Sequence, residues 1–268
     1  MDIRAYYGLT KIPFVKGTEL KNLFETQDRK EVTGRLGYLM NAKGVGVVTG
    51  NPGTGKTSIV REYVRNMNPS LYKTVYVKMT SVSSSEFFRQ IAYGLGLDPA
   101  YRKADVFKQV QEEITYLAKD KRCLPVIIVD ECQLLKQEIL RDLVLLMNYE
   151  MDSRDNCIVV LLGLGALNGM LNKAINEALK QRIIVNYHMD GLRYDEISSY
   201  IKHVLKECGS EDPIFTEGAI EAAYGNCQGS VRKLNRILHL AMQEGMNRDV
   251  QQIDAEIVKT AWEEMDLS

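Results

Sequence analysis

Five short runs of apolar and β-branched residues recur along the first 190 positions of the chain. Runs of this length, bounded by glycine or by polar residues, predict β-strands. The third run, at residues 125–129, has no polar residue and is followed by two acids, which suits a parallel strand covered on both faces. The predicted strands span residues 44–49, 74–79, 125–131, 156–162 and 182–187.

The segments between these runs carry apolar residues at intervals of three and four, the spacing of one face of an α-helix. Ser83, with Glu86 three positions later, adds a capping-box signature at one helix start. Because strands alternate with helices, the expected fold class is a three-layer α/β sandwich with a parallel five-stranded sheet. The predicted helices span residues 27–40, 58–64, 83–94, 104–118, 137–149 and 167–179.

The pattern changes near Gly191, after which only helical spacing remains. Helices are predicted there at residues 194–207, 216–224, 230–245 and 254–265. At the other end of the chain, Gly8 and Pro13 punctuate a segment that predicts an extended, turning arm with aromatic anchors. The expected divisions are therefore an arm at 1–24, a sheet domain at 25–190 and a small helical domain at 191–268.

The composition and net charge bear on whether the protein binds nucleic acid or membranes. With 45% apolar and 26% charged residues and a net charge of -1, the chain has no global positive field toward nucleic acid or membrane. Binding to nucleic acid or membrane would therefore need a local basic patch, or many subunits that act together. No apolar run approaches the roughly 20 residues of a membrane helix, and no signal-peptide pattern occurs. Five scattered cysteines without a C-x-x-C pair favour a reducing compartment, so we expect a cytoplasmic protein without a membrane partner.

One stretch carries a specific chemical signal. Residues 50–57 fit the phosphate-binding pattern G-x-x-x-x-G-K-[ST], and they lie between a predicted strand and a predicted helix. Glycines there let successive backbone N–H groups face phosphate oxygens, and the helix adds the partial positive charge of its N-terminus. Lys56 would place an ammonium on the β- and γ-phosphates, and Thr57 would offer its hydroxyl to Mg²⁺. The predicted nucleotide contacts are Gly50, Asn51, Pro52, Gly53, Thr54, Gly55, Lys56, Thr57 and Ser58.

Two adjacent acids end the third predicted strand. Asp130 would hold Mg²⁺ through its water shell, and Glu131 would orient and deprotonate the water that attacks the γ-phosphate. By strand alternation, we expect Glu131 to point to the face opposite that of Asp130. Solvated acids at a strand end are the plain alternative.

The acid pair separates classes of nucleotide-binding protein. No Asn-Lys-x-Asp tetrapeptide for guanine occurs in the sequence. Small-molecule kinases often lack the second acid, whereas an adjacent Asp-Glu is typical of motors and switches that hydrolyse ATP. ATP with Mg²⁺ is the predicted ligand.

Two further arginines are candidates for the phosphate chemistry. Arg182, just before the fifth predicted strand, is either a surface charge or a finger that reaches a neighbouring subunit's γ-phosphate; Arg154 is a weaker candidate. Arg232 begins a helix of the predicted helical domain and would touch the γ-phosphate if that domain folds over the nucleotide. The competing interpretation of Arg232 is a solvated face, shared with Lys233 and Arg236, that contacts DNA phosphates.

Other basic residues are scattered, and a solvated surface is their default interpretation. In a helical assembly, one patch per subunit would instead become a continuous stripe for DNA. The residues concerned are Arg61, Arg65, Lys73, Lys78, Arg102, Lys103, Lys119, Lys121 and Arg122.

Taken together, these motifs resemble a known family over nearly the whole chain. The sequence is similar to an AAA+ ATPase of the ExeA-like group, close to the transposition ATPases called TniB, MuB and IstB. The matching stretches are residues 6–9 with 12–14, 50–57, 129–135, 181–183 with 187–189, 200–205 and 229–235. The opening Tyr-Gly-Leu with Pro-Phe, and the Tyr-Ile-x-His-x-Leu stretch, are more specific than the two nucleotide motifs.

The resemblance implies a P-loop AAA+ core with a helical lid, and oligomers with ATP at subunit interfaces. It also implies that the arm lies near the adenine, with Tyr7, Ile12 and Phe14 as candidates and Phe14 preferred. One departure concerns the polar residue that often follows the fourth strand in Gly-Gln-Pro-Glu-Leu. This sequence has Gly163-Leu164-Gly165 there, so Gln133 or Asn168 is expected to substitute, or hydrolysis to be slow.

Within the resemblance two functions compete. The first is an ATP-dependent, double-stranded-DNA-binding transposition regulator that forms a ring or helical filament and recruits a transposase. The second is a switch for secretion or envelope machinery that binds no nucleic acid. The secretion proteins of this type are usually longer, with a membrane span and a wall-binding part, and this sequence shows neither, so the first is favoured. A small-molecule kinase is a third, more remote alternative.

Overall fold

The computed structural model describes residues 2–16, 23–150 and 154–266. Residues 1 and 17–22 of the predicted arm lie outside this range. The chain forms two compact units. The sheet unit comprises Lys30–Gly50 and Lys56–Met189, and the helical unit comprises Met1–Arg29, Asn51–Gly55 and Asp190–Ser268.

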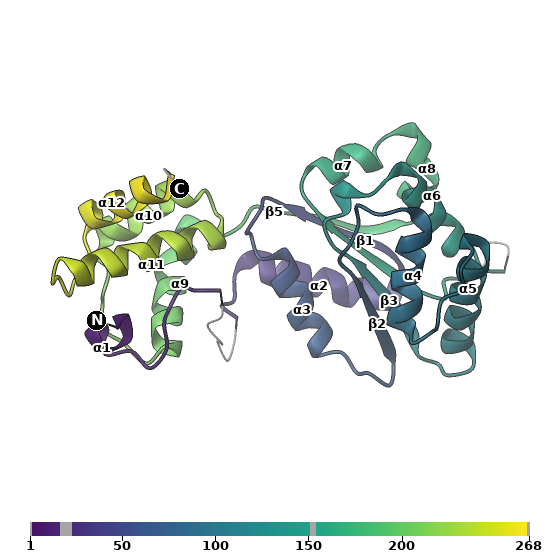
Figure 1. Ribbon diagram of the computed structural model, residues 1–268, viewed down its shortest axis with the longest axis horizontal. Helices are drawn as coiled ribbons and strands as arrows, with labels where there is room; N and C mark the ends of the chain where they lie inside the picture. The colour runs from purple at the N-terminus through teal and green to yellow at the C-terminus, as the bar shows by residue number, and fades with distance from the viewer. Residues whose placement is uncertain (1, 17–22, 151–153, 267–268) are drawn as a thin grey trace. The chain divides into compact units, whose positions relative to one another are not determined.

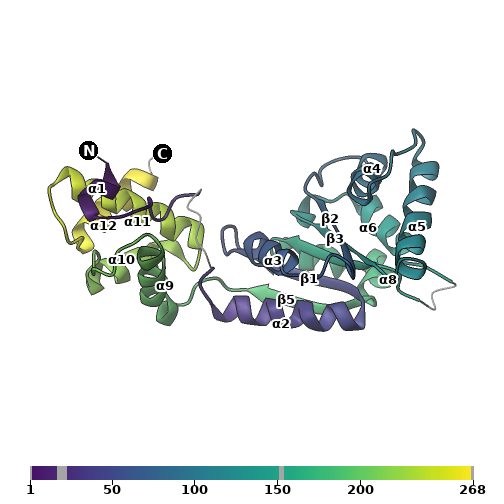
Figure 2. The same cartoon turned by 90° about the horizontal axis from the view of Figure 1, so that it is seen from below.

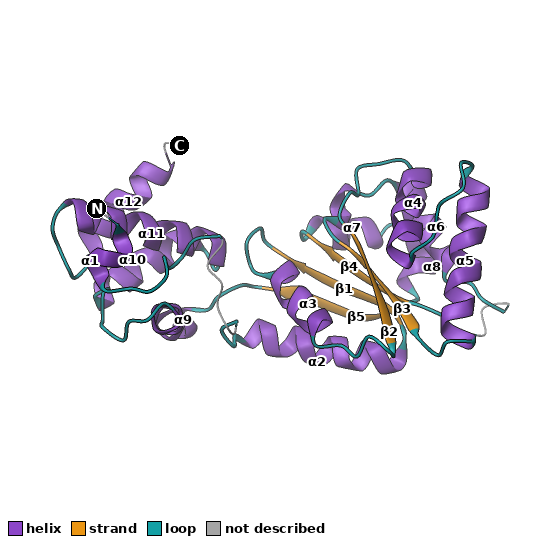
Figure 3. Cartoon of the chain, turned by 60° about the horizontal axis from the view of Figure 1, so that its bottom comes forward, coloured by secondary structure: helices purple, strands orange, loops and turns teal. Residues whose placement is uncertain are grey.

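The sheet unit is built on five parallel strands in the order β2-β3-β4-β1-β5 (Figure 3). The predicted parallel five-stranded sheet is therefore confirmed. Residues that follow β1 and β3 leave the sheet at the same edge, because all the strands run the same way. The strands are β1 Gly44–Gly50, β2 Tyr72–Val77, β3 Leu124–Val129, β4 Ile158–Gly163 and β5 Ile183–Met189.

Helices cover both faces of this sheet. Helix α2 lies on one side of the strands and α4, α5 and α6 lie on the other (Figure 2). The helices are α2 Gln27–Ala42, α3 Lys56–Arg65, α4 Ser84–Leu95, α5 Lys103–Lys119, α6 Gln137–Leu146, α7 Ala166–Leu171 and α8 Glu177–Lys180. Two 3₁₀ turns, η1 Cys132–Leu134 and η2 Ala174–Asn176, follow β3 and α7.

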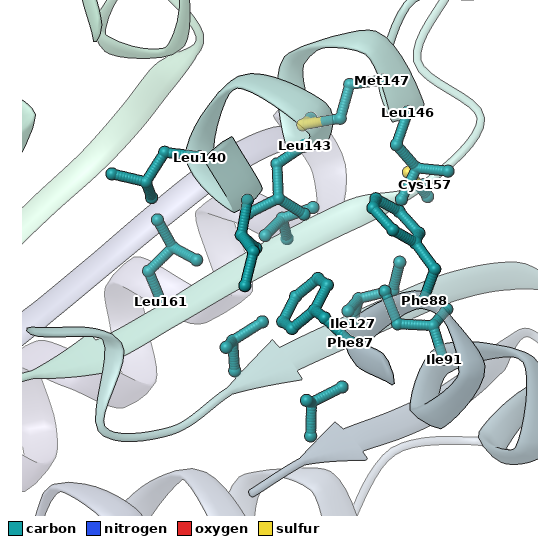
Figure 4. Close-up of a cluster of buried hydrophobic side chains, with 14 of the residues drawn as sticks. Phe87, Phe88, Ile91, Ile127, Leu140, Leu143, Leu146, Met147, Cys157 and Leu161 are labelled. Carbon is teal, nitrogen blue, oxygen red and sulfur yellow. The ribbon is translucent and has the colours of Figure 1, made fainter. Parts of the chain in front are cut away.

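Strand alternation divides the buried residues between the two faces. In β3, Ile127 and Val129 belong to the core under α4, α5 and α6, whereas Val126 and Ile128 belong to the core under α2 and α3. Figure 4 shows the first core, where Phe87 of α4 lies beside side chains from α6 and the strands. A sheet that is apolar on both faces explains why its strands read as unbroken apolar runs.

The helical unit combines the C-terminal helices with the beginning of the chain. Its helices are α1 Ile3–Tyr7, α9 Tyr194–Glu207, α10 Glu217–Cys227, α11 Val231–Asn247 and α12 Ala255–Asp266. Helix α1, purple in Figure 1, packs beside α11. The hydroxyl of Tyr7 donates a hydrogen bond of 3.1 Å to the carbonyl of Met242, and the Phe14 ring packs edge-on to Phe215 with centroids 6.0 Å apart.

Three local expectations are wrong. The arm is not wholly extended, because Asp2 accepts a hydrogen bond from the N–H of Arg4 and caps the short helix α1. The predicted helix at 167–179 is broken into α7, η2 and α8, and the Asn176 amide donates to the carbonyl of Met170 at 2.7 Å. Helix α6 ends at Leu146 rather than Tyr149, which instead forms a β-bridge with Arg154.

Candidate nucleotide site

The phosphate-loop sequence connects β1 directly to α3, as its motif requires. Strand β1 ends at Gly50 and α3 begins at Lys56. Gly53 and Gly55 have φ of 81° and 100°, values that residues with a Cβ rarely adopt. The loop can therefore follow this path because glycine occupies both positions.

Lys56 is the cation of the loop. Its side chain is only 9% exposed, and Nζ donates a hydrogen bond of 2.8 Å to the carbonyl of Gly50. Removing an ammonium from water is costly unless anions or carbonyls surround it. The buried ammonium at the C-terminal end of β1 is thus ready for an anionic ligand.

Three hydrogen-bond donors surround the carboxylate of Asp130, which follows β3 and is 7% exposed. Its Oδ2 accepts from the hydroxyl of Thr57 at 2.9 Å and from the hydroxyl of Tyr76 at 2.8 Å. Its Oδ1 accepts from the N–H of Glu131 at 2.9 Å. Together these bonds hold the Asp130 carboxylate in one orientation.

The pair Thr57 and Asp130 fits magnesium. Mg²⁺ prefers hard oxygen ligands and is usually bound by one or two protein oxygens together with water and substrate phosphates. A hydroxyl and a carboxylate in hydrogen-bond contact beside the phosphate loop provide that donor set. When bound, the ion would neutralise charge on the phosphate oxygens.

Tyr76 was not predicted as a site residue. It lies in β2 between the buried Val75 and Val77, with 51% of its surface exposed. Burial of the hydroxyl and its hydrogen bond to Asp130 raise the pKa of Tyr76, so the phenol stays protonated and donating. The sequence offered one signal, an aromatic residue on the outward face of a strand.

Glu131 lies next in the chain but in different backbone geometry. The strand ends at Val129, and Glu131 has φ of 53°, in the left-handed region. The expectation that strand alternation directs Glu131 is therefore wrong, because a turn and not a strand sets its direction. Its exposed carboxylate accepts a hydrogen bond of 2.7 Å from the side-chain amide of Gln133.

Arg182 lies at the N-terminal ends of the strands, whereas the phosphate loop follows the C-terminal end of β1. Its carbonyl accepts from the N–H of Val45, and Val45 pairs with Ile183 at the start of β5. The phosphate loop begins after Gly50, about 17 Å further along β1 at 3.3 Å per residue. Within one chain, Arg182 is too distant to reach a nucleotide bound at that loop.

Arg232 lies against the phosphate loop within the helical unit. Its backbone N–H donates to the carbonyl of Gly53 at 3.2 Å, and the hydroxyl of Ser230 donates to the carbonyl of Pro52 at 3.0 Å. A Cβ on Gly53 would lie only 2.7 Å from the Cβ of Arg232. The Arg232 side chain itself is exposed.

The remaining predicted contacts divide into two groups. In the loop, the buried Thr54 donates through its hydroxyl to the carbonyl of Asn51 at 3.0 Å, which stabilises the turn, and Ser58 is half-buried on α3. Phe14 is different, since it is 4% exposed and its ring packs on Phe215. In this structure the Phe14 ring packs in the core of the helical unit, and a contact with adenine stays a prediction from the resemblance.

The family relationship follows from this geometry and from sequence comparison. Residues 40–171, which include the loop, Asp130 and Glu131, match the model of a family described as an AAA domain. The chain contains an AAA domain. Its sheet order, phosphate loop and acid pair together form a P-loop AAA+ fold, and the resemblance inferred from the sequence is confirmed.

Two relatives of this AAA protein have different named roles. General secretion pathway protein A of Aeromonas hydrophila is 29% identical over 241 residues, covering 88% of this chain and 44% of that protein. ATP-dependent target DNA activator B of Escherichia phage Mu is 28% identical over 145 residues, covering 54% of this chain and 42% of that protein. The chain spans less than half the length of each of these relatives.

Solved structures show the same fold. The crystal structure of Cdc6p from Pyrobaculum aerophilum superposes with a TM-score of 0.70 at 16% identity, covering 92% of this chain and 69% of that one. At such low identity the similarity concerns the fold alone. Within the described residues, no helix is both long enough and apolar enough to cross a membrane.

Proposed function

We propose that this AAA protein binds ATP with Mg²⁺ at residues 50–58 and hydrolyses it to ADP and phosphate. The observation that carries the proposal is the convergence of Lys56, Thr57, Asp130 and Glu131 at one edge of the sheet. Lys56 binds the β- and γ-phosphates, and Thr57 and Asp130 hold the metal ion. Glu131 accepts the proton of the attacking water, the role for which an exposed carboxylate beside the phosphate loop is suited.

The two arginines receive different roles in this proposal. We assign the exposed side chain of Arg232 to the γ-phosphate of the same chain; the backbone bond from Arg232 to Gly53 in the loop supports this role. Arg182 is too distant to do so and acts on the nucleotide of a neighbouring copy. ATP then lies between subunits, and hydrolysis changes how the copies associate in a ring or helical filament.

We further propose that the ATP-bound assembly binds double-stranded DNA and acts in transposition, with a transposase as partner. The relative from phage Mu, whose name includes target DNA, supports this choice. So does the surface of α3. Arg61 and Arg65 are both exposed, lie four residues apart on one side of the helix, and form no ion pair with an acid among the described residues. Repeated in each subunit, such a pair would contact DNA phosphates.

Three other basic residues are less suited to DNA because acids already neutralise their charges. Lys103 lies 2.7 Å from both Glu138 and Asp142. Lys119 and Arg154 both pair with Glu150. This difference between paired and unpaired cations allows a matched experiment.

The experiment is retention of duplex DNA on filters, with and without a non-hydrolysable ATP analogue. We expect retention only with the analogue. The double variant Arg61→Gln with Arg65→Gln should weaken it at least tenfold at moderate salt and flatten the salt dependence. Lys103→Gln with Lys119→Gln removes the same number of positive charges from acid-paired lysines and should change retention less than twofold. Equal effects of the two double variants would exclude α3 as the DNA surface, and no analogue-dependent retention would refute DNA binding.

A second candidate function has its own support. The similarity to General secretion pathway protein A covers 88% of this chain, more than the 54% covered by the phage relative. An ATPase switch for secretion or envelope machinery would bind envelope proteins in the ATP state and retain no DNA. A pull-down with the analogue-bound protein therefore distinguishes the two. Phosphate release from ATP without any acceptor would exclude a small-molecule kinase.

A further inference from the structure

We propose that Gln133 is the positioning residue for the carboxylate of Glu131, and that it takes the place of the polar residue missing after the fourth strand. The proposal rests on ATP hydrolysis as proposed above. Gln133 lies in the 3₁₀ turn η1, two residues after Glu131, and is half-buried. Its amide joins Glu131 to the centre of the sheet.

The two ends of the Gln133 amide have different partners. Nε2 donates a hydrogen bond of 2.7 Å to Oε2 of Glu131. Oε1 accepts a hydrogen bond of 3.0 Å from the backbone N–H of Leu164, which directly follows β4. A bond to an ionised carboxylate is stronger than one between neutral groups, so the Glu131 end is a real restraint.

The chemistry of these partners fixes which way the amide points. A backbone N–H can only donate and a carboxylate can only accept. The oxygen of Gln133 therefore faces Leu164 and its NH₂ faces Glu131, since the reverse orientation would place like groups together at both ends. A residue at position 133 without both a donor and an acceptor cannot make this bridge.

The side chain of Gln133 occupies the space beside Gly163, the last residue of β4. A Cβ added to Gly163 would lie 3.0 Å from Oε1 of Gln133 and 3.1 Å from Cδ2 of Leu167. Position 163 therefore has little room for a side chain while Gln133 occupies this space. Leu164 supplies its backbone N–H in place of a polar side chain, and the amide group arrives instead from η1.

Glu131 needs such a partner. Its backbone is held in the left-handed region, and the hydroxyl of Thr80 donates to its carbonyl at 3.2 Å. Its side chain, however, is exposed, and an exposed glutamate has several rotamers of similar energy. A general base must lie within hydrogen-bond reach of the proton that it takes, so a fixed rotamer raises the fraction of productive complexes.

The test measures kcat and KM for phosphate release together with direct binding of ATP–Mg²⁺ by calorimetry. For Gln133→Ala we expect kcat to fall about tenfold while KM and the binding affinity change less than twofold. For Gln133→Glu, which keeps the shape but places a second carboxylate against Glu131, we expect a larger fall in kcat. Gln243→Ala, at an exposed glutamine of α11, is the matched control and should leave both constants unchanged.

A second arm separates positioning from a general structural effect. In the Glu131→Gln background, Gln133→Ala should cause no further fall in kcat, because the carboxylate to be positioned is gone. Unchanged kcat in Gln133→Ala, or an additive fall in the double variant, would overturn the role of Gln133 while leaving the proposed ATPase function intact. Failure of the unmodified protein to bind or hydrolyse ATP would refute both.

Discussion

The two halves of the phosphate loop have different neighbours. Lys56 and Thr57 belong to the sheet unit, where their side chains bind Gly50 and Asp130. Residues 51–55 make their contacts in the helical unit, where Ser230 and Arg232 bind the loop carbonyls. In the sheet unit the contacts come from side chains, whereas in the helical unit they are made to backbone carbonyls of the loop.

This comparison separates two kinds of contact along the loop sequence. Lys56 and Thr57 are held by side-chain contacts within the sheet unit, whereas Pro52 and Gly53 are held through their carbonyls within the helical unit. Substitutions in the two halves should therefore lower the affinity for ATP–Mg²⁺ for different physical reasons.

The largest effect is expected in the sheet half. Lys56→Ala removes the buried ammonium, and charge-assisted bonds to phosphate are about twice as strong as neutral ones. We expect the Kd for ATP–Mg²⁺, measured by calorimetry, to rise at least about 100-fold, which corresponds to about 2.7 kcal/mol. Analogue-dependent assembly should be lost with it. Lys108→Ala, at an exposed lysine of α5, is the control. Unchanged affinity in Lys56→Ala would remove the basis of the proposed function.

A smaller effect is expected in the half supported by the helical unit. Gly53→Ala would place a Cβ 2.5 Å from the Ser230 hydroxyl oxygen, at a φ that alanine rarely adopts. We expect the loop to shift, and affinity for ATP–Mg²⁺ to fall about tenfold while Lys56 and Asp130 remain in place.

A companion variant shows whether that contact is the cause. If the clash with Ser230 contributes, Gly53→Ala combined with Ser230→Gly should recover part of the lost affinity, because glycine removes the hydroxyl oxygen. Ser230→Gly alone serves as the control for the helix cap that Ser230 provides to α11. Recovery of none of the affinity would place the effect in backbone strain and in the close approach to the Cβ of Arg232.

The smallest expected effect is a pH dependence of stability that arises from His239 in the helical unit. Burial lowers the pKa of His239 below its usual value near 6.5, although a hydrogen bond to the backbone of Pro13 opposes this. The unfolded chain therefore binds a proton more readily than the folded one. The contribution of His239 to the free energy of unfolding is therefore present above the unfolded pKa near 6.5. It is lost as the pH falls below that value. Urea unfolding at pH 7.5 and 5.5 should show this loss, and His239→Gln should reduce the difference between the two pH values. An undiminished difference would assign the pH dependence to other groups.

Much of the fold could be predicted from local pattern. Alternation of apolar strands with amphipathic helices predicted five parallel strands, because strands buried on both faces must be apolar throughout. Boundaries were less predictable where side chains compete with the backbone. Asn176 ended a predicted helix by binding the carbonyl of Met170, and periodicity carries no sign of such a bond.

The residues of the candidate site that belong to local motifs were predicted, and those that depend on long-range contacts were not. Lys56, Thr57 and Asp130 are close in the structure because a motif of fixed spacing and a strand end determine their positions. Tyr76 was missed because its partner Asp130 is 54 residues away and follows a different strand. Phe14 was chosen by resemblance, yet the folded arm places its ring in the helical core.

By itself, the sequence determined the fold class, the phosphate loop and the acid pair. These depend on periodicity, glycine and short spacing, which are local properties of the chain. Only the tertiary structure decided that Arg182 lies at the far edge of the sheet from the loop, that Ser230 and Arg232 hold the loop carbonyls, and that Gln133 binds Glu131. Contacts between distant segments depend on how strands are ordered and how a turn directs a side chain, and no local pattern records either.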